Sequence, residues 1–141
     1  MQPRSEDVPR YADAYFLKTK ACVEHFGDAH VTYAVFMRRP VTSAPRLAVE
    51  WIQAMAEARK TKIEIDLRYK EGSWVGAGEP LLYITGSFRH LVDLETIYLQ
   101  KIGPACVAAF TCCGRVLISP PETDIFTGTV TLATPGLLMV I

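Results

Sequence analysis

The chain has 141 residues, half of them hydrophobic, and its 15 basic and 15 acidic residues give a formal net charge of zero. This length suits one domain of ordinary size with a true core. The balanced charge argues against a nucleic-acid binder. The polar opening MQPRSEDVPR and the absence of a long apolar run argue against a signal peptide and a membrane span, so we expect a cytoplasmic protein.

Cysteine and histidine spacing predicts no metal site. The four cysteines show no Cys-x-x-Cys pair, and the three histidines are scattered. Adjacent Cys112 and Cys113 are therefore expected to be small buried apolar residues rather than ligands.

The first predicted helix contains the segment YADAYFLKT (residues 11–19) and ends at Gly27. Residues three and four apart are neighbours on a helix. Four polar or aromatic residues then share a narrow arc: Asp13, Tyr15, Lys18 and Thr19. Two interpretations stay open, because Tyr15 either packs an amphipathic helix against the core or belongs to a ligand-binding cluster.

A strand is predicted from His30 to Arg38, where β-branched and aromatic residues dominate. A second helix is predicted to start near Ser43. Its apolar face carries Leu47, Ala48, Trp51, Ile52 and Met55. The basic run RKTK (59–62) that follows is expected to be a solvated helix end.

Residues 62–70 alternate strictly between polar and apolar and predict a half-buried antiparallel strand. After turns at 71–73 and 76–78, another strand is predicted over 80–85, with Gly86 breaking it. A buried helix is then expected from about Phe88 to Ile102.

Glu95 lies on the apolar line of this last helix. A buried carboxylate needs a cation or several hydrogen-bond donors. The alternatives are a surface glutamate at a different helix rotation, and a structural or interfacial role for Glu95 and its neighbour Thr96.

Beyond Gly103 short β-prone pieces are predicted at 106–112, 116–118, 127–133 and 137–141, with no helix. We therefore expect an α+β fold, with a mixed or antiparallel sheet packed by about three helices. Residues 1–102 would form the domain, and residues 103–141 a short β-rich tail that is no independent domain.

Four segments, taken in order, resemble the amino-terminal domain of nicotinate phosphoribosyltransferases. They are YADAYFLKTKACVEHFG, VTYAVFMRRP, VGAGEPLLYITG and HLVDLETIYLQ, and they span about residues 10–100. In these type II phosphoribosyltransferases the domain precedes an irregular α/β barrel, and the active site forms where it meets the barrel of a partner subunit. The resemblance therefore implies a homo-oligomer or association with a barrel-containing homologue.

The same resemblance implies substrate-binding roles within the first helix. Tyr15 would stack on the pyridine ring of nicotinate, and Asp13 would lie near the ring nitrogen or the ribose, with Thr19 in the same cluster. Lys18 stands where relatives often carry arginine, and it keeps the charge without the bidentate fork.

The pair Glu95-Thr96 bears on the choice of substrate. Quinolinate phosphoribosyltransferases usually have Glu-Arg at this point, and that arginine pairs with a carboxylate of the dicarboxylic substrate. Threonine cannot do so, which favours nicotinate over quinolinate, the runner-up. The complete family enzyme joins nicotinate to phosphoribosyl pyrophosphate in NAD biosynthesis, with magnesium and ATP as implied cofactors.

The catalytic residues of the family lie in the barrel, so none is expected in this chain. A barrel typically needs about 250 residues, far more than residues 103–141 provide. We expect either a truncated or frame-shifted product that is inactive alone, or a domain reused as a non-catalytic binding or dimerisation module. The latter predicts a large exposed apolar patch.

Overall fold

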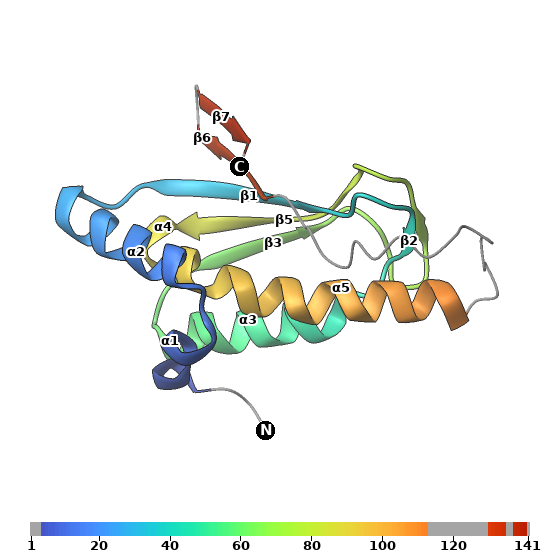
Figure 1. Cartoon of the computed structure of the whole chain (residues 1–141), viewed down its shortest axis with the longest axis horizontal. Helices are drawn as coiled ribbons and strands as arrows, with labels where there is room; N and C mark the ends of the chain where they lie inside the picture. Colours follow the sequence, from blue (N-terminus) through green and yellow to red (C-terminus); the bar gives the residue numbers. More distant parts are fainter. Residues whose placement is uncertain (1–3, 113–129, 135–136, 141) are drawn as a thin grey trace.

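The computed structural model describes residues 4–112, 130–134 and 137–140. Its main sheet is antiparallel, in the order β3-β5-β1-β6-β7. The strands are β1 (His30–Phe36), β3 (Ile63–Leu67), β5 (Pro80–Ser87), β6 (Val130–Thr134) and β7 (Leu137–Val140). Helices lie along one face of this sheet (Figure 1), which confirms the predicted α+β fold.

The helical layer contains long and short elements. The helices are α1 (Val8–Tyr11), α2 (Ala14–Phe26), α3 (Arg46–Ala58), α4 (Phe88–Leu91) and α5 (Glu95–Cys112), with 3-10 turns η1 (Ser5–Asp7) and η2 (Val92–Leu94). Helices α3 and α5 run side by side beneath the sheet in Figure 1. A second, two-stranded sheet joins β2 (Val41–Thr42) to β4 (Trp74–Val75).

The core forms where alternate residues of the central strands face the helices. Tyr33 and Val35 of β1 are buried opposite Ile84 and Leu82 of β5. The buried side chains of the two long helices beneath them include Ala48, Trp51, Ile52, Met55, Tyr98 and Ile102. The predicted apolar face of α3 is therefore confirmed except at Leu47, whose side chain is 58% exposed.

The prediction that Gly86 breaks its strand is wrong, because β5 continues to Ser87. Gly86 pairs with Val31 on one side and with Ile63 on the other. A Cβ atom at this position would lie 3.2 Å from the carbonyl oxygen of Lys62. A side chain here would push against the backbone of the neighbouring strand, so its close approach favours glycine.

The predicted strand at 106–112 is wrong, because α5 continues through Gly103 to Cys112 with Pro104 inside it. Proline removes one helical hydrogen bond, whereas Ile102 and Cys106 bury their side chains completely in the core. The Cys106 Sγ atom also accepts a hydrogen bond from the backbone N–H of Ala44 at 3.4 Å. Packing of Ile102 and Cys106 in the core therefore outweighs the local sequence pattern that predicted a strand at 106–112.

The other predictions for the carboxy-terminal part have mixed outcomes. The strands expected at 127–133 and 137–141 appear as β6 and β7 where the structure describes them, and residues 116–118 lie outside the described residues. The division of the chain at residue 102 stays a prediction. Within the described ranges, none of the helices is both long and apolar enough to cross a membrane.

Candidate functional site

The segment 11–19 is not one continuous helix. Helix α1 ends at Tyr11, the chain extends through Ala12, and α2 begins at Ala14. Asp13 is the N-cap of α2, and its Oδ1 accepts a hydrogen bond from the backbone N–H of Tyr15 at 3.0 Å. A capping aspartate satisfies one of the free N–H groups of the first helical turn. Asp13 thus stands at the end of α2 rather than on its side.

The start of α2 is attached to the start of α5. The backbone N–H of Asp13 donates to Thr96 Oγ1 at 3.2 Å, across 83 residues of sequence. This contact brings Glu95-Thr96 next to the DAYFLKT segment. The predicted substrate-binding cluster and the pair predicted to have a structural or interfacial role are therefore neighbours in the structure.

The remaining residues of the predicted cluster are accessible to solvent. The Tyr15 side chain is 55% exposed, and its ring contacts Phe16 edge-on with centroids 5.5 Å apart. Thr19 donates its hydroxyl to the carbonyl of Tyr15 at 3.0 Å, and Lys18 is exposed. The core-packing interpretation therefore fails for Tyr15. Val23 is the only residue of α2 that is buried.

Glu95 is half-buried at the first position of α5, close to Tyr33 and Tyr98. Burial raises the pKa of its carboxyl group to about 7. Among the described residues Glu95 makes no ion pair, and the hydroxyl of Tyr98 has no hydrogen-bond partner. A buried ion pair does occur in this segment, but two residues earlier, at Asp93.

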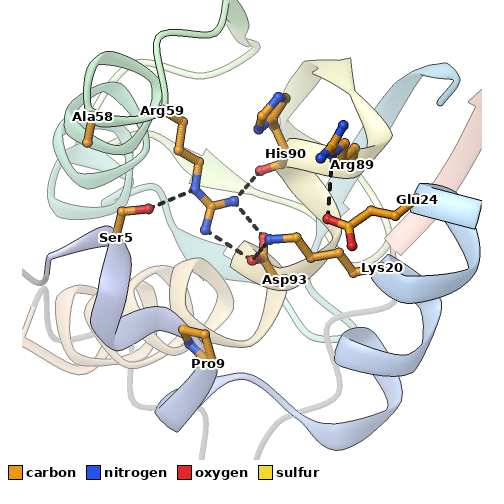
Figure 2. Close-up of a pocket in the computed structure, with 9 residues that line it drawn as sticks. All are labelled: Ser5, Pro9, Lys20, Glu24, Ala58, Arg59, Arg89, His90 and Asp93. Atoms are coloured by element: carbon orange, nitrogen blue, oxygen red, sulfur yellow. Dashed lines mark hydrogen bonds and ion pairs between the residues drawn. The ribbon is translucent and has the colours of Figure 1, made fainter.

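Asp93 lies in η2 with its side chain 1% exposed, and two cations from other helices reach it (Figure 2). The Arg59 guanidinium binds both carboxylate oxygens, at 2.6 and 3.0 Å, and Lys20 Nζ lies 2.6 Å from Oδ2. Burial alone would raise the pKa of Asp93, but the hydrogen bonds from Arg59 and Lys20 outweigh it and lower that pKa. Asp93 is therefore a stably ionised buried carboxylate.

Arg59 contradicts the prediction that residues 59–62 form a solvated helix end. Its side chain is 8% exposed and makes two further hydrogen bonds, to the Ser5 hydroxyl at 3.3 Å and to the His90 carbonyl at 2.8 Å. The signal in the sequence was Asp93 itself, an acid inside the apolar run 91–94, since such an acid needs a cation.

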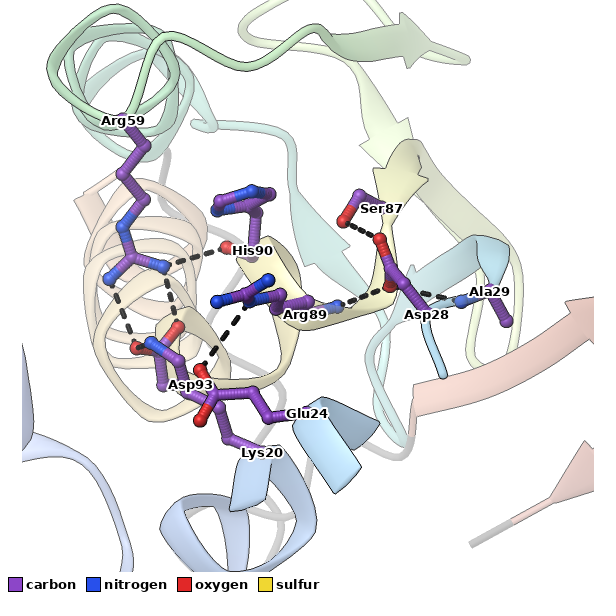
Figure 3. Close-up of polar contacts among 9 residues, drawn as sticks. All are labelled: Lys20, Glu24, Asp28, Ala29, Arg59, Ser87, Arg89, His90 and Asp93. Carbon is purple, nitrogen blue, oxygen red and sulfur yellow. Dashed lines mark hydrogen bonds and ion pairs between the residues drawn. The ribbon is translucent and has the colours of Figure 1, made fainter. Parts of the chain in front are cut away.

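A neighbouring corner orients α4 (Figure 3). Asp28 accepts hydrogen bonds from the Ser87 hydroxyl and from the backbone N–H of Arg89. Burial would raise the pKa of Asp28, yet these hydrogen bonds lower it overall. Asp28 thus caps the start of α4. This cap fixes the first turn of the helix and so places Arg89 and His90 beside Arg59.

An open pocket of about 320 Å³ lies over this ion-pair cluster. Its lining residues are Ser5, Pro9, Lys20, Glu24, Ala58, Arg59, Arg89, His90 and Asp93 (Figure 2). Arg89 Nε lies 3.5 Å from Glu24 Oε1 at the rim. Burial, followed by the nearby charges of Arg59 and Arg89, lowers the pKa of His90. Nowhere in the described ranges does a group of three or more His, Cys, Asp or Glu side chains converge to hold a metal ion.

Comparison with known proteins identifies the domain. Residues 13–106 match the family model described as the N-terminal domain of quinolinate phosphoribosyl transferase. None of the curated proteins matches the sequence.

Two solved structures share the fold. Human nicotinic acid phosphoribosyltransferase is 20% identical with a TM-score of 0.62, over 79% of this chain and 29% of that one. The nicotinate-nucleotide pyrophosphorylase of Pyrococcus furiosus is 19% identical with a TM-score of 0.57, over 74% of this chain and 28% of that one. At such identities the likeness is one of fold. This chain spans less than a third of the length of either protein.

The matched residues include the Asp13 cap, Tyr15, the Arg59–Asp93 pair and the Glu95-Thr96 corner within one continuous domain. Through residues 13–106, the chain belongs to the quinolinate phosphoribosyltransferase N-terminal domain family.

Proposed function

We propose that this chain supplies the pyridine-binding part of a phosphoribosyltransferase, which joins a pyridine carboxylate to phosphoribosyl pyrophosphate and releases pyrophosphate. The observation that carries the proposal is the exposed ring of Tyr15, on a helix start that Asp13 caps and Thr96 holds, inside a domain of this family. A ring in that setting offers a flat apolar face to a planar base.

The neighbouring side chains have roles that suit such a ligand. Asp13 uses Oδ1 for the helix cap, which leaves Oδ2 for the ring nitrogen or the ribose. Lys18 provides a positive charge for a carboxylate. Thr19 bonds to the backbone of Tyr15 and so supports the ring platform.

Within this class of substrates we propose nicotinate. Thr96 lies where the starts of α2 and α5 meet, and its hydroxyl accepts a hydrogen bond from the Asp13 N–H. Threonine has no positive charge with which to pair the second carboxylate of quinolinate. Quinolinate is the second candidate, because the family model that matches is that of the quinolinate enzymes.

The proposed site is half of a complete one. A barrel from a second chain, either another subunit or a homologue, would bring phosphoribosyl pyrophosphate, magnesium, ATP and the catalytic residues. An assembly with a barrel-containing chain is therefore part of the proposal, and the 141 residues assayed alone are expected to show no turnover.

Complementation between subunits tests this function. The full chain is co-expressed with a full-length nicotinate phosphoribosyltransferase whose own ring-stacking tyrosine has been replaced by alanine. Mixed assemblies are purified and assayed with nicotinate or quinolinate in the presence of phosphoribosyl pyrophosphate, magnesium and ATP. We expect nicotinate mononucleotide to appear from nicotinate.

Two matched variants show whether this chain provides the platform. Tyr15→Ala should abolish the restored activity, whereas Tyr11→Ala, at another exposed tyrosine, should leave it unchanged. Product from quinolinate alone would replace the nicotinate assignment with the second candidate. Assemblies that form and yield no product from either acid would overturn the proposed function.

A further inference from the structure

We propose that the pocket over Lys20, Arg59 and Arg89 is a binding site for a small tetrahedral oxyanion, either inorganic phosphate or the phosphate group of a monoester. The inference is independent of the pyridine-binding function. It rests on the charge, the unused hydrogen-bond donors and the rigidity of the pocket lining.

The lining carries a surplus of positive charge. Lys20, Arg59 and Arg89 contribute three positive charges, and Asp93 and Glu24 contribute two negative ones, so the sum is +1. Both carboxylates are already neutralised, Asp93 by two cations and Glu24 by Arg89. An incoming anion therefore meets paired acids and one net positive charge.

The cations also retain unused donors. A lysine has three N–H donors and an arginine has five. Lys20 donates one to Asp93, and Arg59 donates four, to Ser5, His90 and both oxygens of Asp93. Within the part of the chain that the structure describes, two N–H groups of Lys20, one of Arg59 and those of the Arg89 Nη atoms have no acceptor.

The Arg59 side of the site and the backbone that carries Arg89 are fixed before any ligand arrives. Four hydrogen bonds hold the Arg59 guanidinium with its side chain 8% exposed, and the Asp28 cap holds the helix turn that carries Arg89. Preformed donors lose little conformational entropy on binding. Guanidinium and ammonium groups form charge-assisted hydrogen bonds with phosphate oxygens. A pocket of about 320 Å³ admits a phosphate group and leaves room for a substituent.

Nuclear magnetic resonance of the full 141-residue chain tests the site. Inorganic phosphate is titrated at constant ionic strength, with sodium chloride and sodium acetate as separate arms. We expect the ring resonances of His90 to shift saturably with phosphate, because an anion beside Lys20 and Arg59 changes the field at His90. The exposed rings of His25 and His30 serve as internal references and should not move.

Matched variants separate the pocket from general surface charge. Arg89→Gln should weaken phosphate binding about threefold or more, as expected for the loss of a charge-assisted contact near the surface. Glu24→Gln removes a competing carboxylate and should strengthen binding. Arg68→Gln is the control, since Arg68 is likewise an exposed arginine beside a carboxylate, that of Asp66 on β3.

The outcomes are decisive in both directions. Saturable binding that weakens in Arg89→Gln, strengthens in Glu24→Gln and stays unchanged in Arg68→Gln supports the site. Equal responses to phosphate and chloride, or equal affinities in all three variants, would overturn it. A stronger response to acetate than to phosphate would replace phosphate with a carboxylate ligand and so overturn the proposed ligand class. The measurement uses no pyridine and no second chain, so its failure leaves the proposed function unaffected.

Discussion

Arg59 and Asp93 form a bidentate ion pair, with hydrogen bonds of 2.6 and 3.0 Å, that joins the end of α3 to the turn before α5. Lys20 adds α2 to the same carboxylate at 2.6 Å. Three helical segments from distant parts of the sequence therefore depend on one buried acid. This arrangement orients the helices that carry both proposed sites.

Asp93→Asn should destabilise the domain strongly. The amide keeps the shape of the side chain but leaves the buried Arg59 without a counter-charge, and breaking such a pair typically costs about 3–5 kcal/mol. Urea unfolding at pH 7 measures the loss. Asp66→Asn, at the exposed pair with Arg68, is the control and should cost less than about 1 kcal/mol. Equal small losses in both variants would contradict the structural role of Asp93.

Acid should weaken the same pair. The folded-state pKa of Asp93 is lowered below its ordinary value of 3.8. Its contribution is therefore fully present above the unfolded-state pKa and is lost as the pH falls through the lower folded-state pKa. Unfolding free energies of the parent chain and Asp93→Asn should converge as the pH decreases below about 4. A difference that stays constant down to pH 2 would be inconsistent with this linkage.

Glu95→Gln should stabilise the isolated chain at alkaline pH. The folded-state pKa of Glu95 is about 7, above its ordinary value of 4.5, so ionisation of this carboxyl opposes folding. The parent chain should lose stability as the pH rises from about 4.5 through 7, by roughly 3 kcal/mol in total. The variant should not show this loss. Unfolding curves at pH 5 and pH 8.5 provide the comparison, and a variant that gains nothing at pH 8.5 would show that Glu95 has a cation after all.

Thr96→Val should loosen the start of α2. Valine has the shape of threonine without the hydroxyl that accepts from the Asp13 N–H, so one exposed hydrogen bond is lost, worth about 0.5–1 kcal/mol. Amide hydrogen exchange at Asp13 should accelerate. Thr96→Ser keeps the acceptor and should retain protection, and unchanged exchange in the valine variant would contradict the contact.

Pro104→Ala should stabilise α5. Proline inside a helix removes one hydrogen bond and disfavours helix by about 3 kcal/mol relative to alanine. The α5 helix nevertheless passes through Pro104, which is exposed. We expect a gain of about 1 kcal/mol or more in thermal unfolding, because proline also restricts the unfolded chain and so offsets part of the benefit. A destabilised variant would show that the proline shapes the helix to fit its neighbours.

Much of the fold was predictable because short-range sequence patterns determine many of its helices and strands. The β-branched and aromatic residues of 30–38 predicted β1, strict alternation predicted β3, and the periodic apolar face predicted α3 with its buried Trp51. The failures have a common cause. Gly86 was predicted to break its strand, and residues 106–112 were predicted to form a strand after a helix ending near Ile102, yet each position was decided by a partner remote in sequence.

The candidate sites divide in the same way. Tyr15 and its neighbours were found because they lie close together in the sequence. The phosphate-binding candidate around Arg59 was missed because its lining residues come from η1, α1, α2, the end of α3, α4 and η2, and no short pattern contains them.

The sequence by itself determined the α+β fold, the approximate places of β1, α3, β3 and β5 and the family resemblance, since local periodicity and ordered motifs suffice for these. Only the tertiary structure decided that Asp13, the N-cap of α2, also donates its backbone N–H to Thr96. It likewise decided that Asp93 rather than Glu95 forms the buried ion pair, and that α5 continues to Cys112. The physical reason is that burial and charge pairing depend on which distant segments meet. A single acid costs energy or contributes stability according to the cation that folding brings to it.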